Sequence, residues 1–134
     1  MAVLEVGFGF YQLAMKTTRI TRDNDNATIC ERCQIADNVL TRVRGLLGRA
    51  GLAEDEGLLI IPCPSIHMFG MKFALDVVFL TREFVVVDLI ENIAPGKAYV
   101  AKKTHGKAHS ALEVFVGTIA RHNIEIGQTL RRDE

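Results

Sequence analysis

Apolar residues in this chain are grouped in short runs of strand length, separated by polar segments or by segments with glycine or proline. Runs rich in valine, isoleucine, leucine and phenylalanine that end at turn residues are typical of β-strands. On this basis we expect strands at 28–36, 57–61, 73–80, 83–90, 110–116 and 125–130. The third and fourth of these are separated by only Thr81 and Arg82, so they are predicted to form a hairpin.

One segment has the period of a helix instead. Val39, Val43 and Leu46 fall on one stripe, and Asp37 precedes them in the position of an N-cap. Gly51 is a residue that commonly ends a helix. The pattern therefore predicts one short amphipathic helix that begins after Asp37 and ends before Gly51. A further helical turn is expected over 118–123.

The first fifteen residues form a separate pattern. Leu4, Val6, Phe8 and Phe10 alternate with Glu5 and with glycines, which is typical of a strand. We expect 1–15 to be an N-terminal extension that adds a strand, and a homodimer through this segment is one prediction. Residues 16–134 are expected to form a single compact domain.

These elements together predict a fold class. Short strands dominate, one good helix is present, and strands and helices do not alternate regularly, which argues against a parallel α/β sheet. The sequence predicts a mainly β (α+β) domain, a compact antiparallel β-sandwich or small barrel that carries one short amphipathic helix.

Composition and charge narrow the classes of partner. Of the 134 residues, 49% are hydrophobic, and 16 basic side chains balance 16 acidic ones, so no long-range field favours nucleic acid or a membrane. The lysine-containing stretch 97–109 offers only Tyr99 for base stacking. Three cysteines and no recognisable export leader favour a soluble protein in the reducing cytoplasm.

Polar groups inside an apolar stretch mark the candidate site. Residues 62–80 place His67 and Asp76 among residues of strong strand character, where polar groups need partners. Such groups either form an internal hydrogen-bond network or line a pocket. Arg44 and Arg49 can reach the same region from the helix as donors for a carboxylate or phosphate, and Met71 offers deformable apolar surface.

A metal site is the main alternative for the cysteines. Cys30, Cys33, Cys63 and His67 give the spacing C-x2-C followed by C-x3-H, which a structural zinc ion can use. In a regular strand, however, positions 30 and 33 point to opposite faces. We therefore predict free thiols, no metal and no cofactor.

Several unusual strings occur in order and resemble one known family. They are RGLLGR at 44–49, GLLI at 57–60, PCPSIHMFGMKF at 62–73, LDVVFL at 75–80 and ALEVFVG at 111–117. The chain resembles the prokaryotic domain-of-unknown-function family 192 over roughly residues 28–130. The resemblance implies a mainly β, sandwich-like domain with a short helix, and it implies no established activity, substrate or cofactor.

The same resemblance points to particular residues. The positions that match the family signature are Arg44, Arg49, His67, Met71 and Asp76. The chain departs from the pattern at Ala74, where the family generally has proline, and at Gly70, where a bulkier residue is common. The resemblance implies that many relatives are exported, whereas we expect this chain to be cytoplasmic because no export leader is recognisable in it.

Three functional hypotheses follow. The first is a non-enzymatic binding domain for a small polar or anionic ligand, held by Arg44, Arg49, His67, Met71 and Asp76. The second is a hydrolase or lyase that uses His67 and Asp76 as an acid–base pair. The third is a homo-oligomeric interaction module.

Overall fold

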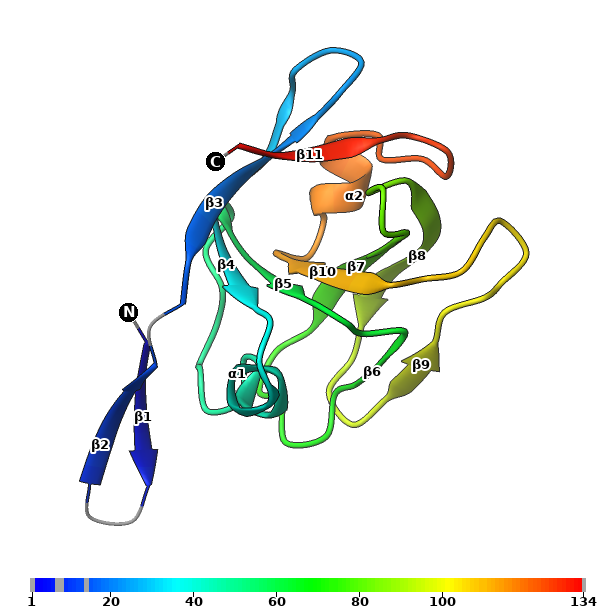
Figure 1. Cartoon of the computed structure of the whole chain (residues 1–134). Helices are drawn as coiled ribbons and strands as arrows, with labels where there is room; N and C mark the ends of the chain where they lie inside the picture. Colours follow the sequence, from blue (N-terminus) through cyan, green and yellow to red (C-terminus); the bar gives the residue numbers. More distant parts are fainter. Residues whose placement is uncertain (1, 7–8, 14, 134) are drawn as a thin grey trace.

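The computed structural model describes residues 2–6, 9–13 and 15–133, which form one large sheet, two small ones and two short helices (Figure 1). The large sheet has seven strands in the order β11-β3-β4-β5-β10-β7-β8. Their bounds are β3 Thr17–Arg22, β4 Thr28–Ala36, β5 Glu56–Ile60, β7 Leu75–Leu80, β8 Val86–Ile93, β10 Ser110–Val114 and β11 Leu130–Asp133. The prediction of a mainly β fold is confirmed.

The sheet is mixed rather than purely antiparallel. Strands β4 and β5 pair in parallel, and the helix α1, Val39–Arg44, lies between them in the sequence. Parallel neighbours need a crossover connection, and the helix with its following loop supplies it. The chain therefore contains one β-α-β unit, which the pattern of residues 28–61 did not reveal because the helix spans only six residues.

The two edges of the large sheet approach each other. An isolated bridge joins Val85, just before β8, to Thr129, just before β11. One bridge is not a continuous ladder, so the described strands curve toward a barrel without closing one.

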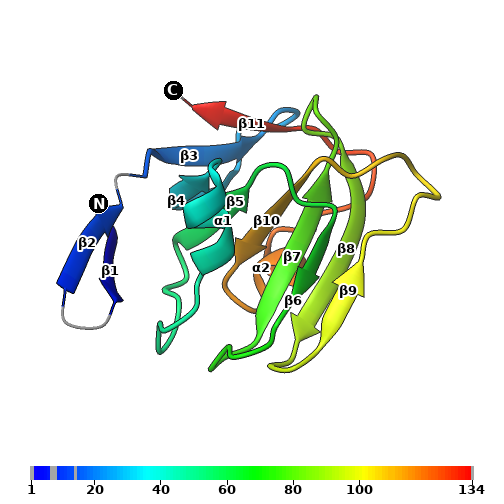
Figure 2. The same cartoon turned by 60° about the horizontal axis from the view of Figure 1, so that its bottom comes forward.

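Both faces of the sheet are buried, each under a different cover. One face carries Leu58, Val77 and Ala111 and is covered by the loop after α1 and by the strand β6, Ser65–His67, which pairs with β9, Ala98–Val100. The other face carries Val78 and Leu112 and is covered by α2, Thr118–Arg121, and by the β11 end of the sheet. Figure 2 shows β6 and β9 lying in front of β7 and β8. The strands β7 and β10 are buried along their whole length because they lie between the two covers.

A bulge in β4 brings two cysteines to the same face. Thr18 pairs with Cys33 and Ile20 with Cys30, so two residues of β4 oppose one residue of β3 between them. The extra residue shifts the alternation, and Cys30 and Cys33 both enter the core on the α2 side. The expectation that they point to opposite faces is wrong for this reason.

The helix α1 differs from the prediction at both ends. Asn38, not Asp37, is the N-cap, and its side chain accepts a hydrogen bond from the Thr41 N–H. Gly45, with φ of 50°, ends the helix six residues before Gly51. Val39 and Val43 are 69% and 70% exposed, so of the predicted stripe only Leu46 enters the core.

The N-terminal segment forms a hairpin rather than a single added strand. Strands β1, Ala2–Val6, and β2, Gly9–Leu13, pair antiparallel with each other and make no ladder with the other described strands. In both views the hairpin extends away from the seven-stranded sheet (Figures 1 and 2).

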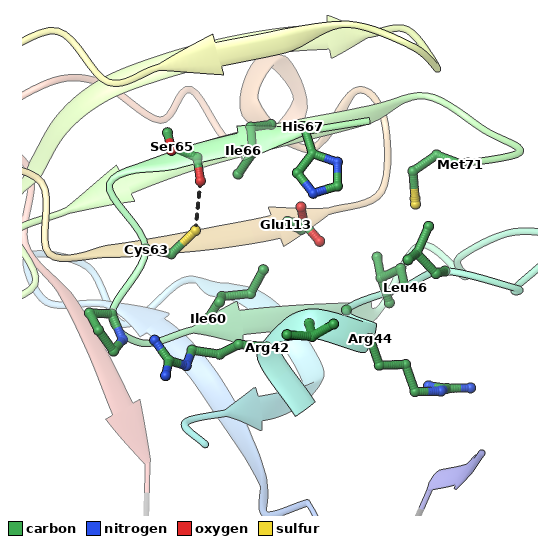
Figure 3. A pocket seen from close by; sticks show the side chains of 14 residues that line it. Arg42, Arg44, Leu46, Ile60, Cys63, Ser65, Ile66, His67, Met71 and Glu113 are labelled. Carbon is green, nitrogen blue, oxygen red and sulfur yellow. Dashed lines mark hydrogen bonds between the residues drawn. The ribbon is translucent and has the colours of Figure 1, made fainter. Parts of the chain in front are cut away.

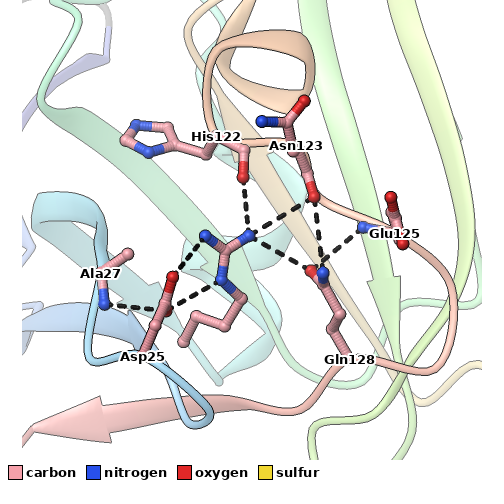
Figure 4. Close-up of polar contacts among 7 residues, drawn as sticks. Asp25, Ala27, His122, Asn123, Glu125 and Gln128 are labelled. Atoms are coloured by element: carbon pink, nitrogen blue, oxygen red, sulfur yellow. Dashed lines mark hydrogen bonds and ion pairs between the residues drawn. The ribbon is translucent and has the colours of Figure 1, made fainter.

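Arg22, at the end of β3, joins distant parts of the chain (Figure 4). Its guanidinium binds both carboxylate oxygens of Asp25 at 3.0 and 2.9 Å and donates to the His122 carbonyl at 2.6 Å. A weaker contact reaches the Gln128 side chain at 3.4 Å. One largely buried cation thus connects the β3–β4 turn to the segment between α2 and β11.

Candidate functional site

A pocket of about 170 Å³ lies between α1 with its following loop, β6 and the face of the large sheet that β6 covers (Figure 3). The strands β5 and β10 form its floor, through Ile60 and Glu113. The other lining residues come from α1 and the turn after it, and from the segment leading into and beyond β6. These are Arg42, Val43, Arg44, Gly45, Leu46, Leu47, Pro62, Cys63, Ser65, Ile66, His67 and Met71.

Glu113 is the polar group on the floor of this pocket. In the sheet it pairs with Leu58 and Val77, which belong to the core on the same face, so its side chain is placed on an apolar surface. It is 6% exposed, and burial raises the pKa of its carboxyl to about 7. The carboxyl makes no hydrogen bond or ion pair with any residue that the structure describes. It therefore retains its full hydrogen-bonding capacity toward the pocket.

His67 faces Glu113 from the opposite wall. It belongs to β6, whose pairing with β9 holds this wall over the sheet, and Ile66 beside it anchors the strand in the core. The imidazole is exposed and stacks on Phe69, with ring centroids 5.3 Å apart. In Figure 3 the ring points toward the Glu113 carboxyl. The pair can hold one small polar group between them.

Cys63 also lines the pocket. Its thiol donates a hydrogen bond to the Ser65 carbonyl at 2.9 Å. Burial and the neighbouring Glu113 raise the pKa of the thiol to about 11, while Arg42 acts in the opposite direction. The thiol is therefore protonated at neutral pH and is a poor nucleophile.

The two predicted arginines are placed differently. Arg44 lines the pocket, although its side chain points away from Glu113 in Figure 3. Arg49 does not line the pocket, because its guanidinium binds both carboxylate oxygens of Glu56 at 3.2 Å. Arg42 lines the pocket, and the sequence analysis did not select it.

Asp76 lies on the other face of the sheet from this pocket. It pairs with Val114, which belongs to the core on the α2 side, and it is fully buried. Its carboxylate accepts hydrogen bonds from the N–H groups of Asn92 at 2.9 Å, Gly117 at 3.0 Å and Ile119 at 3.0 Å. The last two donors lie at the start of α2, where Gly117 has no side chain to cap the helix.

The predicted pairing of His67 with Asp76 is therefore corrected. The sheet separates the two side chains, and the Asp76 oxygens already accept three backbone hydrogen bonds. Of the five predicted residues, Arg44, His67 and Met71 line the pocket, while Arg49 and Asp76 do not. The residue that the sequence analysis missed is Glu113, although an acid inside the apolar run 110–116 carries the same signal that selected Asp76.

Comparisons with known proteins assign the chain to a family. The model of DUF192, described as an uncharacterised conserved group, matches residues 18–132. The chain belongs to the DUF192 family. It is also 36% identical over 104 residues to the UPF0127 protein of Thermococcus sibiricus, covering 74% of this chain. The alignment spans 64% of that relative's length.

Two solved structures share the fold of this DUF192 domain. One, from Sinorhizobium meliloti, is described as a candidate transcription regulator. It has a TM-score of 0.78 and 20% identity, and the match covers 91% of this chain and 98% of that one. The other, from Novosphingobium aromaticivorans, is described as a protein of unknown function. It has a TM-score of 0.74 and 20% identity, with 98% and 93% of the two chains covered. At this identity the likeness shows the fold alone.

The structure of the DUF192 domain also bears on metals and membranes. Cys30 and Cys33 are buried free thiols, and the pKa of Cys33 is raised by its hydrogen bond to Cys30 and by burial. Within the described part of the chain, no three His, Cys, Asp or Glu side chains come close enough to hold a metal ion. None of the helices there has the length and apolar character needed to cross a membrane.

Proposed function

We propose that this DUF192 domain binds a small polar ligand in the pocket between α1 and β6. The observation that carries the proposal is Glu113, a carboxyl that is 6% exposed, lines the pocket and has no partner among the described residues. Burying an unpaired carboxyl costs several kcal/mol, so a position of this kind is favoured where a ligand supplies the missing hydrogen bonds.

The surrounding residues supply the rest of a binding site. His67 faces Glu113 and offers a second hydrogen-bonding group, while Leu46, Ile60 and Met71 give apolar walls. This combination of a few converging polar groups and apolar sides is typical of small-molecule sites. Arg44 and Met71 keep their predicted place in the proposal. Arg49 and Asp76 are left out of it.

A ligand screen tests this proposal. Thermal unfolding of the wild type is measured with a library of small polar compounds, and the compounds that raise the midpoint are repeated on Glu113→Gln and His67→Ala. We expect both variants to lose the response, with Glu83→Gln, an exposed acid outside the pocket, as the matched control. Compounds that stabilise all four proteins equally would reject the pocket as their site.

An acid–base enzyme, a hydrolase or lyase, is the second candidate, and one observation favours it. A carboxyl with a pKa of about 7 that faces an imidazole can exchange protons near neutral pH. In this hypothesis Glu113 replaces Asp76 as the partner of His67 in the acid–base pair. Incubating each bound compound with the protein and following it by NMR tests the idea. Turnover in the wild type that is absent in Glu113→Gln would support it, and recovery of every compound unchanged would reject it.

A further inference from the structure

The pocket has opposite charges at its two ends. Glu113 is the only acidic residue among those that line it, and it lies on the floor beneath His67. Arg42 lies at the other end, beyond Ile60 in Figure 3. Cys63 lies between them, and its thiol pKa responds to both, with Glu113 raising it and Arg42 lowering it. The two charges therefore act on the same small volume.

The Arg42 guanidinium has hydrogen-bond donors without an acceptor among the described residues. Its Nε donates to the Asn38 carbonyl at 3.3 Å, which fixes the side chain along α1. The two terminal nitrogens form no hydrogen bond or ion pair with residues of the described ranges. A guanidinium with two unoccupied parallel donors is well suited to a carboxylate.

Ligands with a single charge match only half of this arrangement. A ligand with only a carboxylate brings a second negative charge near Glu113. A ligand with only an amine leaves the Arg42 donors without an acceptor. An ammonium group beside Glu113 instead supplies the positive charge and the hydrogen-bond donors that the buried carboxylate lacks. The volume of about 170 Å³ is comparable with that of cavities that accept a molecule the size of benzene, about 150 Å³, which suits a compact organic molecule.

We infer that the ligand is a small zwitterion of the amino-acid class, with its ammonium group on Glu113 and its carboxylate on Arg42. The inference rests on the proposed function and specifies the chemistry of that same pocket. Ile60 contacts the short carbon skeleton between the two charges. His67 accepts a second hydrogen bond from the ammonium group through a ring nitrogen.

Calorimetric titration of the full chain with matched probes tests the inference. The zwitterions are alanine, 3-aminopropanoate and 4-aminobutanoate, whose charges are progressively farther apart, and the single-charge controls are propylamine and propanoate. We expect at least one zwitterion to bind tenfold or more tightly than both controls. Glu113→Gln should abolish the advantage over propanoate, and Arg42→Gln the advantage over propylamine. Arg82→Gln, an exposed arginine outside the pocket, is the control variant and should leave the affinities unchanged.

Proton release gives a second readout. An ammonium group favours the charged carboxylate, so binding should release protons at pH 6.5, as shown by heats that depend on the ionisation enthalpy of the buffer. If Glu113→Gln does not fold, Glu113→Asp is the second variant. It keeps the carboxyl and should retain the preference for zwitterions.

Failure of this inference differs from failure of the proposed function. Equal binding of propanoate or propylamine, or no binding of any zwitterion at 20 mM, would overturn the inference, and the proposed function would stand if other compounds still required Glu113. Loss of that requirement for every compound in the screen would overturn both.

Discussion

Asp76 in β7 and Glu113 in β10 are buried acids in neighbouring strands. The register pairs Asp76 with Val114 and Glu113 with Val77, so the two acids lie on opposite faces of the sheet. Asp76 accepts three backbone hydrogen bonds, whereas Glu113 has no partner in the described part of the chain. Burial alone does not distinguish a structural acid from a candidate functional one, but the hydrogen-bond partners do.

Glu113 should make stability depend on pH. Its folded-state pKa of about 7 lies above the ordinary value of 4.5, so the folded protein keeps a proton that the unfolded chain releases. The free energy of unfolding should therefore fall as pH rises from about 4.5 to about 7, by about 3 kcal/mol in total, and change little from this group above that range. Urea denaturation between pH 4 and 8 measures the effect. Glu113→Gln should remove this part of the pH dependence, and an unchanged profile in that variant would contradict the assignment.

Asp76→Ala should destabilise the fold without acting on the pocket. The substitution leaves the N–H groups of Asn92, Gly117 and Ile119 without their acceptor, and we expect a loss of about 3 kcal/mol or more in the free energy of unfolding. Urea denaturation measures this loss. The control is Glu83→Ala, which removes an exposed acid and should change the free energy of unfolding little. Stability equal to that of the control would show that Asp76 is not the anchor of α2.

At the scale of elements, α1 shows how a correct pattern leads to a partly wrong expectation. The period of Val39, Val43 and Leu46 is helical, and a helix does form. It lies at the rim of the pocket, however, so Val43 borders the pocket and Val39 faces solvent, and only Leu46 packs in the core. Its early end at Gly45 frees the following turn to line the pocket with Leu46 and Leu47.

At the scale of elements, we predict that loss of the connection made by Arg22 lowers the stability of the fold. Arg22→Ala removes the ion pair with Asp25 and the hydrogen bond to the His122 carbonyl, which together hold the β3–β4 turn against the segment after α2. We expect a loss of about 2 kcal/mol in the free energy of unfolding, because these bonds involve a largely buried charge. Denaturant unfolding should show a much smaller change for Arg19→Ala, whose pair with Asp133 is exposed. Equal losses in the two variants would contradict a special role for Arg22.

At the scale of the whole molecule, the hairpin of β1 and β2 stands apart from the domain. A two-stranded hairpin is marginally stable by itself in water, so pairing with another copy of the chain would stabilise it. The homodimer through this segment stays a prediction, now with a hairpin in place of a single strand. Its two strands each have one edge that forms no ladder with other described strands.

Deletion of residues 1–14 tests this prediction. Because the hairpin adds no strand to the seven-stranded sheet, we expect the shortened chain to fold with an unchanged unfolding midpoint. Light scattering coupled to size-exclusion chromatography should show a dimer for the full chain and a monomer for the shortened one. Identical masses for the two chains would reject the dimer through this segment.

The sequence by itself determined the mainly β class, the hairpin of β7 and β8, the position of one helix and the short helical turn near residue 118. These features depend on local periodicity and turn residues, which act over a few neighbours in the chain. The strings that resemble DUF192 also identified the family. His67, Met71 and Arg44 were selected from the same local signals, and all three line the pocket.

Only the tertiary structure decided which polar groups meet. The parallel pairing of β4 with β5, the bulge that turns Cys33 and the register of β10 beside β7 depend on contacts between residues far apart in the chain. A shift of one residue in such a register moves a side chain to the other face of the sheet. For that physical reason, Asp76 holds α2 in place and Glu113 lies in the pocket, although both acids look alike in the sequence.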